Sequence, residues 1–214
     1  MAQSIDPAAV DHSLRRLVDA IVAGDHLLFA QLLKESPTLA MASFSQGATR
    51  QGSAVNTHFI EAIGLCLYSG DTALHVAAAA YRHPMAEQMI AAGAAVRAKN
   101  RRGAEPLHAA AKGAPGAAPW DPTAQSATIR CLITAGADPN AANMDGATPL
   151  HIAIRTRCAS AVQTLLDRGA DPSIRNRNGS AAVDLVMRTT GRSGSGSPEA
   201  KAQQEEILLL FKGG

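Results

Sequence analysis

The chain has 214 residues, a formal net charge of +2, 46% hydrophobic residues and only 3% aromatic residues. So small a net charge does not indicate nucleic-acid binding, and no apolar run approaches the length of a membrane-spanning helix. The scarcity of aromatic side chains and the abundance of alanine favour thin, stacked helical layers in one elongated domain over residues 1–214.

Residues 7–37 are predicted to form a pair of helices that caps the N-terminal end of the stack. Apolar residues recur at helical spacing in the first of these helices, at Leu14, Leu17, Val18 and Ile21. Gly24 and Asp25 then make a turn, and a second apolar face follows before Pro37. Charged side chains on this pair give it the solvated outer face that the end of a stacked fold requires.

Residues 38–69 form an enlarged connector. The step from Leu33 to Thr72 is 39 positions, against 15 for the equivalent step further along the chain, so the insertion has 24 residues. It begins polar and ends in residues 56–63, which we expect to form a short helix. The apolar residues on one face of this end of the connector are Phe59, Ile63 and Leu67. So long a connector either packs beside the stack or contacts a partner.

One eight-residue stretch occurs in four copies. It reads Gly-Asp-Thr-Ala-Leu-His-Val-Ala from Gly70, Gly-Ala-Glu-Pro-Leu-His-Ala-Ala from Gly103 and Gly-Ala-Thr-Pro-Leu-His-Ile-Ala from Gly146, with a degenerate copy from Gly179. The glycines are spaced by 33, 43 and 33 residues, a period typical of stacked repeats. The predicted repeats are residues 70–102, 103–145, 146–178 and 179–214.

The residue types in this stretch predict how each repeat folds. Thr148 is suited to cap a helix that starts at Pro149. His151 stands where a capping box has Glu or Gln, so its imidazole reaches both the cap and a neighbouring backbone group. A second helix in each repeat ends at a glycine able to take the left-handed conformation, namely Gly93, Gly136 and Gly169.

The patterns Gly-x-Thr-Pro-Leu-His-x-Ala-Ala and Leu-Leu-x-x-Gly-Ala-Asp resemble the ankyrin repeat, strongly over residues 70–188 and more weakly at both ends. Ala73, Glu105 and residues 181–184 depart from the pattern. The resemblance implies an all-α ankyrin repeat solenoid of stacked helix-turn-helix units with hairpin-like connectors, called fingers. Ankyrin-like proteins bind other proteins through the surface of the first helices and the finger tips. The alanine-rich repeats and glycine-rich inserts also resemble uncharacterised bacterial ankyrin repeat proteins.

Two further insertions interrupt the turns between paired helices. The second repeat is ten residues longer than the first and the third because of a Pro- and Gly-rich stretch over residues 113–122, and its second helix is expected to resume at Gln125. The fourth repeat has a Gly/Ser tract over residues 191–197, after which Ser197 is expected to cap the last helix. Both insertions should leave the same edge of the stack, opposite the fingers.

Charge placement gives the candidates for partner binding. Residues 69–192 hold 14 Lys or Arg against 9 Asp or Glu, whereas both ends of the chain are net acidic. The basic residues near the ends of the first helices either stabilise helix C-termini or form a stripe that binds an acidic protein surface. The candidates are Arg82, Lys112, Arg155, Arg157 and Arg188, the finger residues Arg97, Lys99, Arg101 and Arg102, and Trp120 in the inserted loop. Trp120 is alternatively a buried anchor of its loop.

Catalytic and metal-binding chemistry is not expected. His75, His108 and His151 recur once per repeat, but stacking places them about 10 Å apart, too far to ligate one metal ion together. No Lys follows the glycines of the Gly/Ser tract, as a phosphate-binding loop requires, although Arg192 beside it is compatible with weak anion binding. Cys158 lacks a His and Asp partnership. The sequence therefore predicts no catalytic residues, no metal and no cofactor.

The predicted function is a non-enzymatic protein–protein interaction module with a protein partner that presents an acidic surface, and with no nucleic-acid or membrane partner. Three cysteines without metal-ligand spacing and an N-terminus unlike a signal peptide favour the cytoplasm. Two alternatives stay open. One is a neutralising or regulatory subunit that inhibits a toxin or an enzyme by covering its active site. The other is a small-anion-binding protein or enzyme that uses the Gly/Ser turn.

Overall fold

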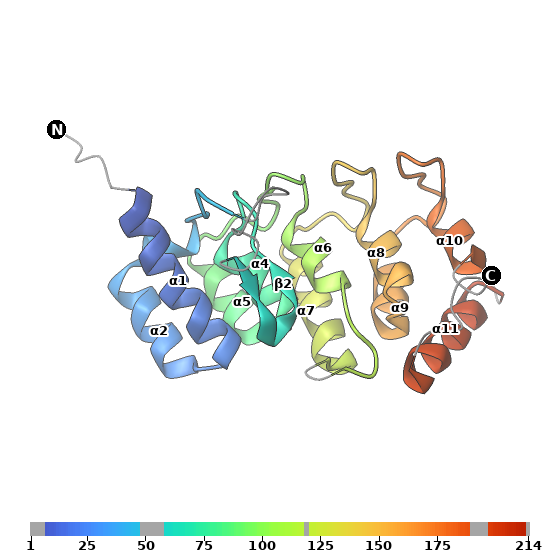
Figure 1. Cartoon of the computed structure of the whole chain (residues 1–214), viewed down its shortest axis with the longest axis horizontal. Helices are drawn as coiled ribbons and strands as arrows, with labels where there is room; N and C mark the ends of the chain where they lie inside the picture. Colours follow the sequence, from blue (N-terminus) through green and yellow to red (C-terminus); the bar gives the residue numbers. More distant parts are fainter. Residues whose placement is uncertain (1–6, 48–57, 118–119, 189–196, 213–214) are drawn as a thin grey trace.

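The protein is a single row of antiparallel helix pairs, with α1 at one end and α11 at the other (Figure 1). The computed structural model describes residues 7–47, 58–117, 120–188 and 197–212. Each pair packs on the pairs beside it: α4 lies against α1 and α6, and α7 lies against α5 and α9. The predicted all-α solenoid is therefore confirmed.

Most elements are short helices of two or three turns. In chain order they are α1 (Pro7–Ala23), α2 (His26–Glu35), the 3-10 helix η1 (Pro37–Ala40), strand β1 (Phe59–Ile60), the 3-10 helix η2 (Glu61–Ile63), strand β2 (Leu65–Cys66), α4 (Ala73–Ala79), α5 (His83–Ala91), α6 (Pro106–Ala111), α7 (Pro122–Thr134), α8 (Pro149–Arg155), α9 (Ala159–Asp167), α10 (Ala182–Arg188) and α11 (Pro198–Leu210). The first helices of the four repeats are α4, α6, α8 and α10, and the second helices are α5, α7, α9 and α11.

Helix ends follow from local chemistry. Asp25, Asp121 and Ser197 cap α2, α7 and α11, each accepting a hydrogen bond from the backbone N–H three residues later at 2.9, 3.0 and 3.2 Å. The helix-ending glycines Gly93, Gly136 and Gly169 have φ of 94°, 100° and 88°, in the left-handed region as predicted. The Asp121 cap also places the start of α7 at Pro122, three residues before the expected Gln125.

The core is a ladder of equivalent residues. The leucine of each intact motif is fully buried in its first helix, at Leu74, Leu107 and Leu150. One large apolar residue of each following second helix is also fully buried, at Met89, Leu132 and Leu165. The buried apolar residues form one continuous cluster along the row, which explains how a chain with few aromatic residues excludes water.

The enlarged connector ends in a β-hairpin, so the helix expected over residues 56–63 is wrong for the residues that the structure describes, which begin at His58. Strand β1 pairs antiparallel with β2, and η2 and Gly64 make the turn. The backbone N–H of Leu67 donates to the carbonyl of His58 at 2.8 Å, which extends the pairing. Short apolar runs fit either period, and here cross-strand bonding satisfies the backbone. Residues 48–57 of the connector lie outside the described part.

The two insertions between paired helices meet at the edge opposite the fingers. Ser197 Oγ donates to the carbonyl of Pro115 at 3.4 Å. Gly116 lies so close to Ser197 and Glu199 that any side chain at this position would overlap the Ser197 hydroxyl. The loop of the second repeat thus spans the third repeat and contacts the start of the last helix. Residues 118–119 and most of the Gly/Ser tract, 189–196, lie outside the described part.

Candidate protein-interaction surface

An asparagine that the sequence interpretation overlooked shapes each of the last three fingers. The Oδ1 atoms of Asn100, Asn143 and Asn176 each accept hydrogen bonds from the backbone N–H groups two and four residues later, at 2.9 to 3.2 Å. Each stands three residues before the first glycine of a motif copy, so the repeat spacing could have revealed it. Adjacent fingers are also hydrogen-bonded, for example from Met144 N–H to the Arg102 carbonyl at 2.9 Å. The fingers therefore form a continuous, pre-ordered edge.

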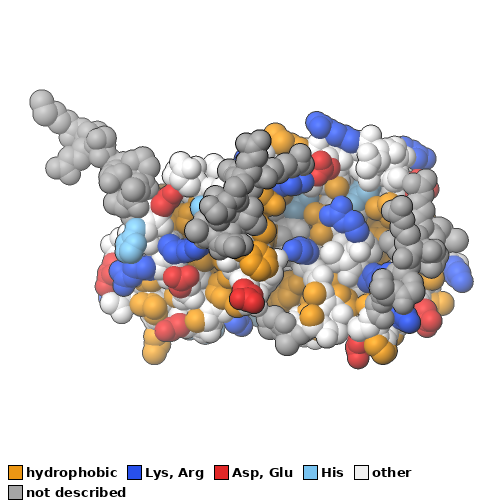
Figure 2. All heavy atoms as spheres, in the orientation of Figure 1, with side chains coloured by type: hydrophobic (Ala, Val, Ile, Leu, Met, Phe, Trp, Pro, Cys, Tyr) orange, Lys and Arg blue, Asp and Glu red, His pale blue; other side chains and the backbone are white. Residues whose placement is uncertain are grey.

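The basic finger is largely neutralised within the chain. Arg97 lies 3.6 Å from the carboxylate of Glu105 and 3.3 Å from that of Asp138. Lys99 lies 3.9 Å from Glu105, and Arg102 lies 3.1 Å from Asp145. Figure 2 shows acidic side chains among the Lys and Arg side chains along this edge. The expected basic finger is thus a mixed charge cluster, and most of its cations already have a carboxylate partner.

Arg101 and Arg102 also stack on Tyr68, which precedes the first repeat. Their guanidinium carbons lie 5.4 and 5.6 Å from the centre of its ring, within the range of a cation–π interaction. The side chain of Arg101 is exposed. Among the finger candidates, Arg101 is the one whose charge has no carboxylate within 4.0 Å in the described part of the chain.

Glu105 is a buried carboxylate in the place of the capping threonine. Its side chain is fully buried, and neither carboxylate oxygen has a hydrogen-bond partner among the described residues. Burial raises the pKa of Glu105, and the nearby Arg97 and Lys99 oppose that change. In the other two intact motifs the threonine hydroxyl lies 3.0 Å (Thr72) and 2.8 Å (Thr148) from Nδ1 of the histidine. Glu105 is therefore a local departure from an otherwise satisfied cap.

We expect Glu105→Thr to raise the free energy of unfolding at neutral pH by about 1–2 kcal/mol, because it removes a buried carboxylate whose ion pairs with Arg97 and Lys99 are long, at 3.6 and 3.9 Å, and restores a hydroxyl cap. The raised pKa means that the folded state binds the proton of Glu105 more tightly than the unfolded chain does. Glu105 therefore destabilises the fold increasingly as the pH rises above the ordinary pKa of a glutamate. The gain should therefore be larger at neutral pH than at acidic pH, as urea unfolding would measure. A matched Thr148→Ala variant should lose stability, and no gain for Glu105→Thr would contradict the assignment.

Two of the candidates at the first-helix ends hold parts of the chain together. The guanidinium of Arg82 donates to the carbonyls of Ile21 and Val22 at 3.3 Å, at the C-terminal end of α1. Lys112 Nζ donates to the carbonyl of Gly64 in the hairpin at 3.0 Å. Arg82 thus joins the N-terminal helix pair to the first repeat, and Lys112 joins the hairpin to the second.

Trp120 anchors its loop. Its indole N–H donates to Gln125 Oε1 at 2.9 Å, and the Gln125 amide donates to the carbonyl of Ala110 at 2.9 Å. Gly113 packs so closely on Trp120 and Cys158 that a side chain there would overlap both. The ring is half-buried, so it supports the loop and also contributes to the surface beside it.

The remaining candidates belong to the third and fourth repeats. Arg155 ends α8, is exposed, and forms no side-chain hydrogen bond or ion pair with any residue that the structure describes. Arg157 occupies the turn after α8 with φ of 59°, a left-handed conformation that is uncommon for a residue with a side chain. Arg188 ends the backbone of α10, and its side chain lies outside the described part.

A groove of about 720 Å³ lies between the hairpin, the ends of α4 and α6, and the inserted loop. Its walls include Ile63 and Leu65 from the hairpin, Ala109 and Lys112 from α6 and its C-terminus, and Trp120 from the loop. Hydrophobic side chains reach the surface in the middle of this face of the molecule (Figure 2). The structure therefore brings Arg82, Lys112 and Trp120 to one groove, which the hairpin and the inserted loop of the second repeat help to build.

The repeated histidines are structural. In each intact motif Nδ1 accepts from the backbone N–H of the cap residue, at 3.1 to 3.2 Å. Nε2 in turn lies 3.1 to 3.2 Å from a carbonyl of the next repeat, at Ala104, Ala147 and Ser180. Burial lowers the pKa of all three histidines, that of His108 to about 4. Both ring nitrogens are engaged, so each imidazole is a neutral link between consecutive repeats.

The start of α11 is already occupied by groups of the chain. Ser197 Oγ accepts from Ala200 N–H, and hydrogen bonds with its own backbone and with Ser197 lower the pKa of Glu199. The Ser197 hydroxyl and the Glu199 carboxylate thus occupy the start of the helix, where an anion would otherwise bind. None of the helices in the described ranges is long and apolar enough to cross a membrane.

Comparison with protein families agrees with this geometry. A model of the ankyrin repeat matches residues 69–101, and a model of ankyrin repeats in many copies matches residues 132–186. The first match covers α4 and α5, and the second covers the end of α7, all of α8 and α9 and most of α10. No curated protein matches the chain.

Proposed function

Because this chain belongs to the ankyrin repeat family, whose repeats are generally protein–protein interaction modules, we propose that it binds a protein partner through its first-helix face. The proposal assigns it no enzymatic activity. The partner would contact the groove between the hairpin and the Trp120 loop, and would continue over α8 toward Arg155. The groove is the observation that carries the proposal.

The shape and polarity of the groove support a protein partner. Its alanine-rich floor and the side chains of Ile63, Leu65 and Trp120 offer apolar contact area, while Lys112 retains N–H donors beyond its bond to Gly64. Arg155 lies on the next first helix, α8, which packs on α6. The charge of Arg155 has no counter-charge within the described part of the chain, which favours carboxylates on the partner.

This surface is narrower than the one proposed from the sequence. Arg101, Lys112, Trp120 and Arg155 remain as contact candidates. Four of the other candidates contribute through contacts within the chain. Arg82 shapes the groove, and the finger edge is shaped by Arg97, Lys99 and Arg102. Arg157 follows α8 and Arg188 ends α10, so both positions lie at the edge opposite the fingers.

Of the alternatives, a subunit that covers the active site of a toxin or an enzyme uses the same face and differs only in the partner. A small-anion site at the Gly/Ser turn has less support, because Ser197 and Glu199 occupy the start of α11. We place the protein in the cytoplasm because Cys66, Cys131 and Cys158 are all free thiols.

Affinity purification of the intact protein followed by mass spectrometry tests the proposal. We expect a stoichiometric protein partner, whose affinity falls about tenfold or more for Ala109→Trp, which fills the groove, and for Arg155→Glu, which reverses an exposed charge. Arg16→Glu, on the exposed side of α1, is the matched control and should bind normally. A partner that binds all three variants as tightly as the unmodified chain would place its site elsewhere, and tight binding of a phosphate compound that depends on Arg192 would replace the proposal.

A further inference from the structure

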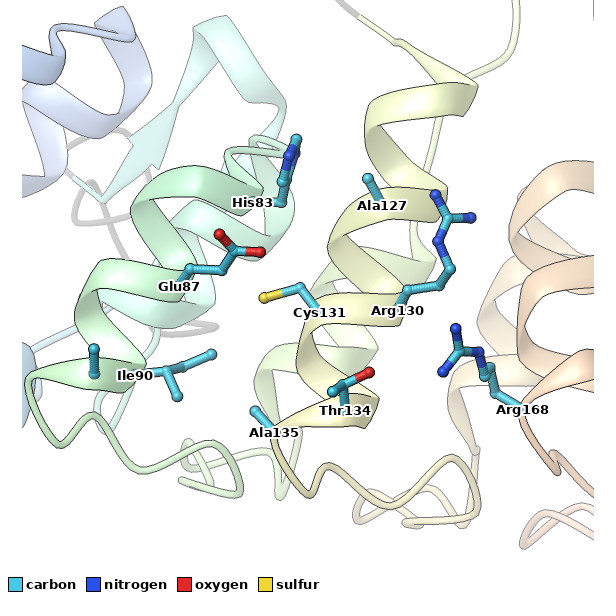
Figure 3. Close-up of a pocket in the computed structure, with 10 residues that line it drawn as sticks. His83, Glu87, Ile90, Ala127, Arg130, Cys131, Thr134, Ala135 and Arg168 are labelled. Carbon is cyan, nitrogen blue, oxygen red and sulfur yellow. The ribbon is translucent and has the colours of Figure 1, made fainter.

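A second groove lies on the opposite side of the helix row, between the second helices α5 and α7. It has a volume of about 560 Å³, and none of its lining residues lines the groove beside Trp120. We call this second groove the outer groove. Figure 3 shows that α5 forms one wall, while α7 and the end of α9 form the other. Its principal side chains are His83, Glu87, Ile90, Arg130, Cys131 and Arg168.

The floor of this groove is apolar. Ile90 from α5 and Cys131 from α7 are both half-buried there, and the thiol of Cys131 points across the groove toward α5 (Figure 3). Ala127 on α7 and Ala135, the residue that caps α7, lie one turn before and one turn after Cys131, so the adjacent turns place only short side chains beside the thiol. The accessible floor can therefore contact apolar side chains of another molecule.

The two walls carry opposite charge. Arg130 on α7 and Arg168 at the end of α9 are both exposed, and neither has a carboxylate within 4.0 Å in the described ranges. This contrasts with Arg97, Arg102 and Arg175, which are all paired with acidic residues on the finger side. On the α5 wall the charged residue is Glu87, whose carboxylate faces Cys131 (Figure 3).

Two exposed guanidinium groups on one wall favour carboxylates on whatever lies in the groove, because arginine binds carboxylates through charge-assisted, often bidentate hydrogen bonds. We propose that this outer groove docks an amphipathic segment of a second protein. Apolar side chains of that segment lie over Ile90 and Cys131, and its carboxylates face Arg130 and Arg168. The inference is independent of the proposed function of the first-helix face, and it gives the chain two binding faces that can be occupied at once.

The thiol of Cys131 is a native reporter for this groove. In a Cys66→Ser background, Cys131 is the only cysteine that is not fully buried, since Cys158 is inaccessible. The probes are two matched amphipathic peptides, one of Leu and Glu and one with Lys in place of every Glu. The measurement is the rate of alkylation of Cys131 by N-ethylmaleimide with and without each peptide. Because burial and Glu87 raise the pKa of the Cys131 thiol, each variant is compared only with itself.

We expect the Glu peptide to protect Cys131 at about tenfold lower concentration than the Lys peptide, because its carboxylates pair with Arg130 and Arg168 at an exposed site. Arg130→Glu with Arg168→Glu should reverse that preference, and Glu87→Lys should strengthen protection by the Glu peptide. Arg16→Glu, on the exposed side of α1, is the control and should change nothing. Absence of protection, equal protection by both peptides, or a preference that survives the double charge reversal would overturn the proposal.

Discussion

His151→Ala is expected to lower the free energy of unfolding by about 3 kcal/mol, the largest effect of a single substitution that we anticipate. The imidazole accepts from Thr148 N–H through Nδ1 and contacts the Ser180 carbonyl through Nε2, both in a buried setting. Alanine would leave the buried Thr148 N–H without a partner, at a cost of about 1–3 kcal/mol. It would also empty the buried imidazole site and remove one of the two hydrogen bonds of the Ser180 carbonyl, which still accepts from Asn176 N–H at 3.0 Å. Urea unfolding followed by circular dichroism measures the loss.

The matched control is His26→Ala, because His26 is exposed on α2. Its effect should stay within about 0.5 kcal/mol. His108→Ala should resemble His151→Ala, since His108 makes the same two contacts with Glu105 N–H and the Ala147 carbonyl. A similar small loss for all three variants would mean that the histidines contribute packing but no link between repeats.

Acidification is expected to destabilise the protein progressively below about pH 6.5, before surface carboxylates begin to titrate. Burial lowers the pKa of His75, His108 and His151 in the folded state, so the unfolded chain binds more protons. The stabilisation is fully present above the ordinary histidine pKa of about 6.5 and is lost as pH falls through that value toward the folded pKa. For His108, whose folded pKa is about 4, the loss amounts to about 3 kcal/mol at pH 4.

Two carboxylates modify this acid response in opposite directions. Asp71 lies 3.7 Å from Nε2 of His75 and favours its protonated form. The pKa of His75 is therefore lowered less than burial alone would lower it. Glu105 has a raised pKa and binds its proton more readily in the folded state, which partly offsets the histidines. The measurement is the free energy of unfolding at several pH values, and His108→Ala should give a shallower pH dependence. An unchanged stability down to pH 4 would contradict the neutral histidine links.

The sequence predicted the parts of the fold that depend on neighbouring residues. Thr148, His151 and the glycine at 169 act within one turn of their own helix, so residue type and spacing suffice to place them. The hairpin was mistaken for a helix because its stability depends on contacts far along the chain, such as that of Gly64 with Lys112. A short apolar run does not encode that difference.

The candidate surface was harder to predict for a similar reason. The sequence identifies the basic residues but not their partners: Arg82 bonds to carbonyls some 60 positions earlier, and Arg97 meets Asp138 one repeat later. These long-range contacts decide which cations lack a carboxylate partner. Arg155 stands out because several of the other candidates are paired within the chain. The outer groove was missed because Arg130 and Arg168 stand on different repeats.

The contact between Ser197 and Pro115 has a consequence for how the protein opens. In a row of repeats that touch only their neighbours, the last repeat can fray alone, and local unfolding exposes its backbone to proteases. Here a hydrogen bond and close packing at Gly116 join residues 82 positions apart and span the third repeat. Gln203 adds a bond from Ala159 N–H at 3.0 Å. The C-terminal half therefore tends to open as one cooperative unit, which keeps Arg155 and the start of α11 in fixed relation while a partner is bound.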